Sequence, residues 1–275
     1  VLKAAVEGRL VPTEAELARE QARAYETGAT LLQRALEIRR RQWSGKGQLS
    51  IPAGPSGSDL PLLPNGWEWA SAMQACDRVI DCHNKTARYV ADGIPLVRTT
   101  NVRDGQLLTD DLRFVDQPTY EFWSRRCPPR PGDVIFTREA PMGEAAIIPA
   151  DLKVCLGQRT MLMRPSMAID KAFLLAALTS PVVRHVIEQL AVGSGVKHLR
   201  VGDVERLPVP LPPLAEQHRI VAEVDRRLSI VREVESEVDA NLKRAETLRQ
   251  AVLARAFAPT GTTGAGQSEQ AVAPA

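Results

Sequence analysis

The longest regular pattern of apolar positions lies near the C-terminal end of the chain. From Leu214 to Ala258 there is no Pro or Gly, and apolar residues recur at alternating spacings of three and four. This spacing is typical of a coiled-coil seam, and a helix of about 40 residues is roughly 60 Å long. Few compact domains cover that length, so the pattern predicts a long helix that packs against a partner helix; an ordinary amphipathic surface helix is the alternative. The seam consists of Val221, Val224, Leu228, Val231, Glu235, Val238, Leu242, Ala245, Arg249, Val252 and Ala256.

A second helical pattern lies near the start of the chain. Residues 14–43 lack Pro, contain one Gly, and are rich in Ala, Leu, Glu and Arg, which lose little side-chain entropy in a helix. We therefore predict a helix over 14–43, within a helical region that spans residues 1–44. Eight Gly and Pro residues follow between Gly45 and Pro64, and they predict a linker over residues 45–61.

The middle of the chain, residues 62–208, has a mixed pattern. Short β-favouring runs at Ile94–Thr100, Asp133–Thr137 and Ala145–Ile148 are separated by Gly and Pro. Residues 171–190 have helical spacing with Pro181 inside, which predicts two helices, the second capped by Ser180. Strands and helices do not alternate regularly, so we predict an α+β domain and not a doubly wound sheet.

The Pro-rich stretch Leu207–Pro213 cannot be helical and separates this domain from the long helix, which we place at residues 209–258. The small, polar residues 259–275 predict a disordered tail.

Composition narrows the class of protein. The 275 residues include 35 Lys and Arg against 33 Asp and Glu, and this balance does not by itself indicate a nucleic-acid partner. No apolar run reaches the roughly 18–20 residues that span a bilayer, so we expect no membrane association. Four cysteines without a secretory leader fit free thiols in a reducing cytoplasm.

The motifs of common enzyme classes are absent from the sequence. There is no phosphate-binding Gly-x-x-x-x-Gly-Lys-Ser/Thr loop, no dinucleotide Gly-x-Gly-x-x-Gly motif, and no Gly-x-Ser-x-Gly nucleophile elbow. Cys76, Cys82 and His83 are close in sequence but do not have zinc-site spacing. We therefore predict a protein that is not an enzyme and holds no metal or cofactor of its own.

Five motifs, in this order, carry a resemblance to a known family. The chain resembles the specificity (S) subunit of type I restriction-modification enzymes over roughly residues 1–258. The pairs Gln158-Arg159 and Arg164-Pro165 fall where that family has similar residues. The five motifs are Leu63–Trp69, Gly93–Val102, Pro131–Arg138, Gly193–Leu199 and Leu211–Gln217.

The resemblance implies a fold, a function and partners. One target recognition domain would be flanked by long helices that form an antiparallel coiled coil, with residues 1–44 as the end of a central helical repeat. The domain would read one half of a bipartite double-stranded DNA site, and the helices would dock methyltransferase (M) subunits and, indirectly, the restriction translocase (R) subunit. S-adenosylmethionine, ATP and Mg²⁺ are expected on those partners only. The chain is either the C-terminal half of a two-domain subunit, which the absence of Met at residue 1 favours, or a half-subunit that dimerises.

Polar loops of the middle domain supply candidate DNA contacts. Arg can read guanine, Asn can read adenine, hydroxyls can donate, and Lys can neutralise a phosphate. The alternatives are a polar hairpin turn at Val102–Gly105, a surface ion pair between Arg138 and Glu139, and a helix C-cap at Gly193. A basic run at Arg125, Arg126 and Arg130 is a weaker candidate. The predicted contact residues are Arg98, Thr99, Thr100, Asn101, Arg103, Arg138, Gly193, Ser194, Gly195, Lys197 and His198.

A second function from another class also fits the sequence: a coiled-coil adaptor or assembly protein whose middle domain binds another protein. The two functions differ in the surface they need. A DNA-recognition domain needs polar and basic loops on one face, whereas an adaptor needs an exposed apolar patch.

Overall fold

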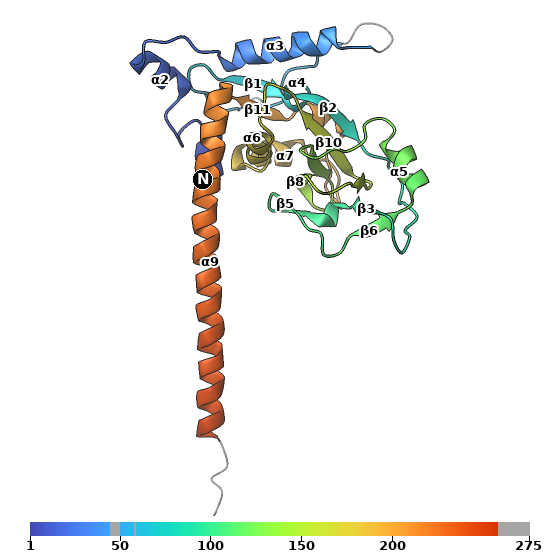
Figure 1. Ribbon diagram of the computed structural model, residues 1–275, viewed down its shortest axis with the longest axis vertical. Coiled ribbons are helices and arrows are strands. Elements are labelled where there is room, and N and C mark those ends of the chain that lie inside the picture. Colours follow the sequence, from blue (N-terminus) through green and yellow to red (C-terminus); the bar gives the residue numbers. More distant parts are fainter. Residues whose placement is uncertain (45–49, 58, 258–275) are drawn as a thin grey trace, which may run out of the picture. The chain divides into compact units, whose positions relative to one another are not determined.

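The computed structural model describes residues 1–44, 50–57 and 59–257. The chain forms two units, Val1–Arg227 and a second unit that starts at Leu228. Helix α9 (Leu214–Ala256) begins in the first unit and continues into the second, which confirms the long C-terminal helix (Figure 1). The predicted tail at 259–275 lies outside the described residues, as do residues 45–49 and 58 of the predicted linker. Residues 50–57 and 59–61 are in neither helix nor strand.

A four-stranded antiparallel sheet forms the centre of the first unit. Its strand order is β2-β10-β7-β8, so β2 and β8 are the edges. Residues 134–137 are buried on both faces of the sheet, which explains the continuous apolar run Val134–Phe136. The mixture of this sheet with separate helices confirms the α+β class. The strands are β2 (Cys76–Asp81), β7 (Val134–Arg138), β8 (Met142–Ile147) and β10 (Thr160–Pro165).

A smaller sheet and a hairpin pack beside the central sheet. Strand β3 (Ile94–Val97) pairs antiparallel with β6 (Arg113–Val115) and parallel with β9 (Cys155–Leu156). The hairpin of β4 (Val102–Arg103) and β5 (Gln106–Leu107) turns at Asp104 and Gly105, whose φ angles are 49° and 78°. Two positive φ angles are typical of a type I′ turn, so the predicted hairpin turn is confirmed. Val97, Ile135, Ile148, Leu156 and Leu162 belong to the core cluster that joins these elements.

The Pro-rich stretch forms part of the first unit and does not separate two units. Strand β11 (Pro208–Leu211) is extended, as predicted, and pairs antiparallel with β1 (Glu68–Ser71). The first turns of α9 are also buried, with Ile220 1% exposed and Val224 6% exposed. The unit boundary therefore lies inside α9 and does not coincide with the predicted domain limit at residue 208.

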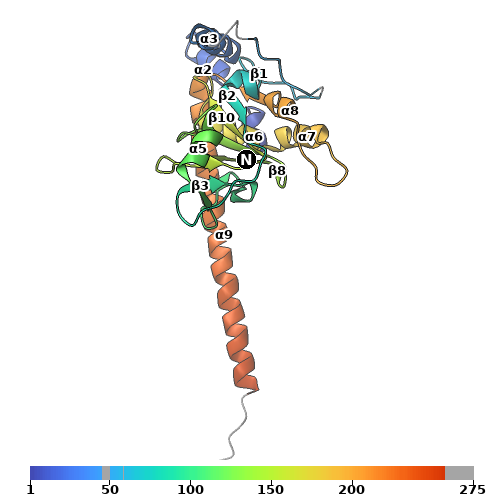
Figure 2. The same cartoon turned by 90° about the vertical axis from the view of Figure 1, so that its right-hand side faces the viewer.

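Two helices follow β10, as their sequence predicts. Helix α6 (Lys171–Leu178) ends before α7 (Pro181–Leu190), and the Ser180 hydroxyl accepts a hydrogen bond from the Val183 N–H at 3.3 Å. Two short helices, α4 (Ala72–Ala75) and α8 (Val201–Glu205), and one longer helix, α5 (Gln117–Ser124), complete the middle of the chain. Both views place α3 at one end of the first unit and β3 at the other (Figures 1 and 2).

The predicted single helix over residues 14–43 is wrong. The chain instead forms α1 (Leu2–Val6), α2 (Glu14–Glu20) and α3 (Gly28–Arg41), with a break in which Ala22 has a φ of 50°. Thr27 caps α3, and Gly28 packs so tightly that an added Cβ would lie 2.0 Å from the Leu211 carbonyl oxygen. Tertiary packing thus fixes a helix start that propensity alone did not show. The expectation of long helices on both sides of the domain is met only by α9, since α3 has 14 residues.

Among the described residues, no helix is both long and apolar enough to cross a membrane.

Candidate nucleic-acid interface

Four loops that lie far apart in sequence converge on one region of the first unit. The Thr99 hydroxyl donates to the Ala140 carbonyl at 3.0 Å, and the Arg138 N–H donates to the Arg159 carbonyl at 2.9 Å. His198 forms isolated β-bridges with Glu139 and Val192. We call residues 98–103, 138–142, 157–159 and 193–198 the loop cluster. It contains every predicted DNA-contact residue, so the structure brings together positions that sequence reasoning selected separately.

Asn101 has a structural position within the loop cluster. Its side chain is 3% exposed; its Oδ1 accepts from the Arg98 N–H at 3.0 Å and its Nδ2 donates to the Asp111 carbonyl at 3.2 Å. Both polar atoms of the amide are therefore already hydrogen-bonded within the protein. This corrects the expectation that it reads adenine, because a buried and bonded amide cannot meet a base edge without opening the loop.

Arg98 and Arg103 are also bonded within the protein. The Arg98 guanidinium pairs with the Asp111 carboxylate at 2.9 Å and donates to its carbonyl at 2.8 Å. Arg103 donates to the carbonyls of Thr99 at 2.9 Å and Val102 at 2.6 Å. These bonds hold the loop in shape, and the Thr100 side chain remains exposed.

Arg138 joins two parts of the first unit. Its guanidinium lies 3.0 Å from the Asp81 carboxylate at the end of β2 and donates to the Leu199 carbonyl at 2.9 Å, and its side chain is 16% exposed. The alternative of an ion pair with Glu139 is wrong, because Glu139 pairs with Arg159. Arg138 thus positions the loop at 193–198 and is poorly placed to contact DNA.

The loop at 193–198 presents the most accessible predicted residues. Two backbone hydrogen bonds between Val192 and His198, at 3.0 and 2.9 Å, close the loop. Gly193 has a φ of 111°, and an added Cβ would lie 2.7 Å from the Val196 carbonyl oxygen, so glycine is required there. The helix C-cap alternative is wrong, because α7 ends before this loop at Leu190, with Ala191 extended. Ser194, Gly195 and Lys197 are exposed.

A cleft beside the loop cluster contains residues that the sequence reasoning missed. Lys85, Tyr89 and Gln158 line it together with Thr99 and Thr100. The sequence places Gln158 only within a family-like motif, and nothing in the spacing of Lys85 or Tyr89 distinguishes them from ordinary loop residues. Only the tertiary structure shows that they share a cleft with the predicted first loop.

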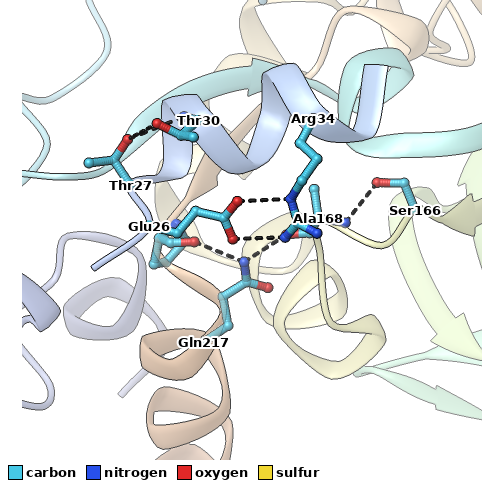
Figure 3. Close-up of polar contacts among 8 residues, drawn as sticks. Glu26, Thr27, Thr30, Arg34, Ser166, Ala168 and Gln217 are labelled. Atoms are coloured by element: carbon cyan, nitrogen blue, oxygen red, sulfur yellow. Dashed lines mark hydrogen bonds and ion pairs between the residues drawn. The ribbon is translucent and has the colours of Figure 1, made fainter. Parts of the chain in front are cut away.

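The start of α9 is fixed by a buried polar network. The Gln217 amide donates to the carbonyls of Ala168 at 2.8 Å and Pro212 at 2.9 Å, and its oxygen accepts from the Asp170 N–H at 2.8 Å. Figure 3 shows the hydrogen bond of Gln217 to Ala168 and, as a separate interaction, the pairing of Arg34 with Glu26. The motif Leu211–Gln217 therefore has a structural role, which is to anchor α9 on the first unit.

Glu216 belongs to the same anchor. Its carboxylate accepts from the Trp67 indole at 3.0 Å and from the Glu14 N–H at 2.8 Å. Burial raises the pKa of Glu216. Burial also acts to raise the pKa of Glu14, but hydrogen bonds from Arg23 and Arg219 outweigh it and hold that pKa below its usual value.

The four cysteines are free thiols. Burial raises the pKa of Cys82 to about 12 and of Cys155 to about 11, so these thiols stay protonated at neutral pH and are poor nucleophiles. Within the described part of the chain, no group of three or more His, Cys, Asp or Glu residues could hold a metal ion.

Residues 126–240 match the family model described as "Type I restriction modification DNA specificity domain". Over these residues the chain is similar to type I DNA specificity domains. This confirms the resemblance found in the sequence. The matched residues include three of the four loops of the cluster and the anchored start of α9, but not the loop at 98–103.

Two curated relatives of this chain are specificity subunits. The chain is 29% identical to the type I restriction enzyme EcoBI specificity subunit of Escherichia coli over 169 residues, which are 61% of this chain and 35% of that protein. It is 26% identical to the EcoKI specificity subunit of E. coli strain K12 over 199 residues, 70% of this chain and 42% of that one. The chain therefore spans less than half the length of these relatives.

A solved structure described as "Structural basis underlying complex assembly and conformational transition of the type I R-M system" has a similar fold. The TM-score is 0.53 at 24% sequence identity, and the match covers 84% of this chain and 53% of that one. At this identity the likeness bears on the fold alone.

Proposed function

We propose that this chain is the DNA-recognition part of a type I restriction-modification complex and reads one half of a bipartite double-stranded site. The observation that carries the proposal is that the matched specificity domain contains three loops of the cluster, at 138–142, 157–159 and 193–198. Loops held on a rigid body by bonds such as Arg138 to Asp81 are suited to present side chains to base edges.

The charge of the middle domain favours binding within a complex. Between Pro61 and Pro208 there are 18 basic and 17 acidic residues. Attraction to the phosphate backbone grows with the number of phosphates that cations neutralise, so this domain alone has little non-specific affinity. Stable binding is expected to need a second recognition domain and the M subunits, which would enclose the duplex.

The exposed part of α9 fits a docking role. Several seam residues in the second unit are well exposed: Val231 45%, Val238 58%, Leu242 58% and Val252 65%. An apolar stripe of this length is costly in water and is typical of a helix that packs on another helix. We assign it to the antiparallel coiled coil and to the docking of M subunits, with Glu235 and Arg249 paired or at the end of the contact.

The chemistry of modification and cleavage is assigned to the partners. In this proposal the chain has no catalytic activity of its own, and S-adenosylmethionine, ATP and Mg²⁺ act on the M and R subunits. The protonated thiols of Cys82 and Cys155 fit this division, because they are poor nucleophiles. A cytoplasmic location remains a prediction.

The adaptor function has less support. The large exposed apolar side chains between residues 62 and 208 come from separate segments, whereas polar loops meet in one cluster. The exposed seam of α9 fits an adaptor and an S-type subunit equally well. The loop cluster therefore favours DNA recognition over the adaptor function.

The test is to co-express the chain with the M subunit of its own system and to map methylated sites on genomic DNA. We expect one bipartite motif, weakened methylation at that motif in the Lys197→Ala variant, and wild-type methylation in the matched control Lys171→Ala on α6. If methylation occurs with the same pattern when the chain is left out, the proposal is wrong.

A further inference from the structure

We propose that Gln158 is a base-reading residue of this domain, with Lys85 and Tyr89 as backbone-contacting residues beside it. This inference rests on the proposed function and names residues that neither the sequence nor the comparisons assign. In the loop cluster, the arginines and the asparagine expected to read DNA are already bonded within the protein. The polar groups that remain available lie in the adjoining cleft.

The cleft is lined by segments that the fold brings together from far apart. Lys85 and Tyr89 come from the loop before β3, Thr100 from the loop after it, and Gln158 from the loop before β10. Lys85, Tyr89 and Thr100 are exposed and Gln158 is half-buried. Among the described residues, none of these four side chains has a hydrogen-bond partner within the protein.

The backbone on both sides of Gln158 is held firmly. The Gly157 N–H donates to the Val97 carbonyl at 2.8 Å, and a Cβ on Gly157 would lie 2.9 Å from that same oxygen. Arg159 has a φ of 65°, and its carbonyl accepts from the Arg138 N–H at 2.9 Å. A strained backbone that its surroundings hold in place is common at binding sites. Gln158 is therefore carried on a firmly held backbone, and its side-chain amide has no partner, which suits a group that reads a base.

The charges around the cleft favour DNA as the ligand. The nearby carboxylates are already paired, Glu139 with Arg159 and Asp111 with Arg98. The Lys85 ammonium is free to neutralise a phosphate, and the Tyr89 hydroxyl, on a side chain that is 44% exposed, can donate to another. A glutamine amide pairs with adenine through two hydrogen bonds, to N6 and N7.

The experiment selects sequences from a randomised duplex DNA library with the full chain in complex with its M subunit. The variants are Gln158→Ala, Gln158→Glu and Lys85→Ala, with Gln33→Ala on the exposed face of α3 as the matched control. We expect Gln158→Ala to lose about 5- to 150-fold affinity for the wild-type motif and to lose the preference at one position. Gln158→Glu is expected to shift that position toward cytosine, since a carboxylate accepts from cytosine N4.

Lys85→Ala is expected to keep the selected motif and to lower the salt dependence of binding by about one unit. Selection of an unchanged motif at unchanged affinity by both Gln158 variants would overturn the inference and leave the proposed function standing. If the wild-type complex selects no motif at all, it is the proposed function that fails. Equal losses in Gln33→Ala and Gln158→Ala would also refute the inference, because the effect would then not belong to the cleft.

Discussion

The anchor of α9 predicts a large and specific loss of stability in Gln217→Met. Methionine has a similar length and helix propensity, so the substitution removes the amide without opening a large cavity. Three backbone groups then lose their partner: the Asp170 N–H and the carbonyls of Ala168 and Pro212. Gln217 is fully buried, and each unsatisfied buried group costs about 1–3 kcal/mol. Local relaxation recovers part of this, so we expect the free energy of unfolding to fall by about 3–5 kcal/mol.

The assay is urea denaturation and thermal melting of the purified chain, followed by tryptophan fluorescence. A loss of this size corresponds to a drop in Tm of about 6–20 °C for a body of this size. The matched control is Gln250→Met, in the same helix but exposed, which should change stability by less than about 0.5 kcal/mol. A loss below about 1 kcal/mol in Gln217→Met would refute the assignment of this network as the anchor.

A charge variant at the same position tests the hydrogen-bond directions. Gln217→Glu keeps an acceptor for the Asp170 N–H but places a carboxylate against two carbonyl oxygens. Burial and these neighbours raise the folded-state pKa of the introduced carboxyl above its unfolded value. Its protonated form is therefore favoured in the fold, and the variant should regain part of its stability below about pH 4.3 and lose it as pH rises. A variant whose stability relative to wild type does not change with pH would contradict the arrangement.

Three further outcomes follow from the structure. Asn101→Ala should lower the free energy of unfolding by about 1–3 kcal/mol, because it leaves the Arg98 N–H and the Asp111 carbonyl without their partner. The DNA motif that the complex selects should stay unchanged, and a changed motif would show that Asn101 does read a base. Arg226 and Arg227 lower the pKa of Glu223 to about 2, so this carboxylate stabilises the fold above about pH 4.5 and loses the effect as pH falls toward 2. Glu223→Gln should flatten this part of the pH–stability curve at low salt, and an unchanged curve would show that these ion pairs do not contribute to stability. The double variant Val238→Asp, Leu242→Asp should leave the melting of the first unit unchanged but abolish co-elution with the M subunit in size-exclusion chromatography. Retained co-elution would show that the M subunit docks on another surface.

Local patterns determined much of this protein. The absence of Pro and Gly after Leu214 predicted α9, Ser180 and Pro181 predicted the break between α6 and α7, and Asp104-Gly105 predicted the hairpin turn. These features depend on neighbours a few residues away, so they can be read from the sequence. The ordered motifs likewise indicated the family before the fold was known.

Tertiary structure decided the rest, because it depends on which distant groups meet. The break before α3 follows from the close approach of Gly28 to Leu211, 183 positions later in the chain, which helix propensity does not contain. Long-range contacts also decide which site residues are available. The sequence shows that Asn101 and Arg138 are polar, but it does not show that Asn101 bonds to Asp111 and that Arg138 pairs with Asp81. Nor does it show that Gln158 remains without a partner in a cleft shared with Lys85 and Tyr89. Residue type and local conformation were predictable, whereas the availability of each side chain for DNA was set by long-range packing.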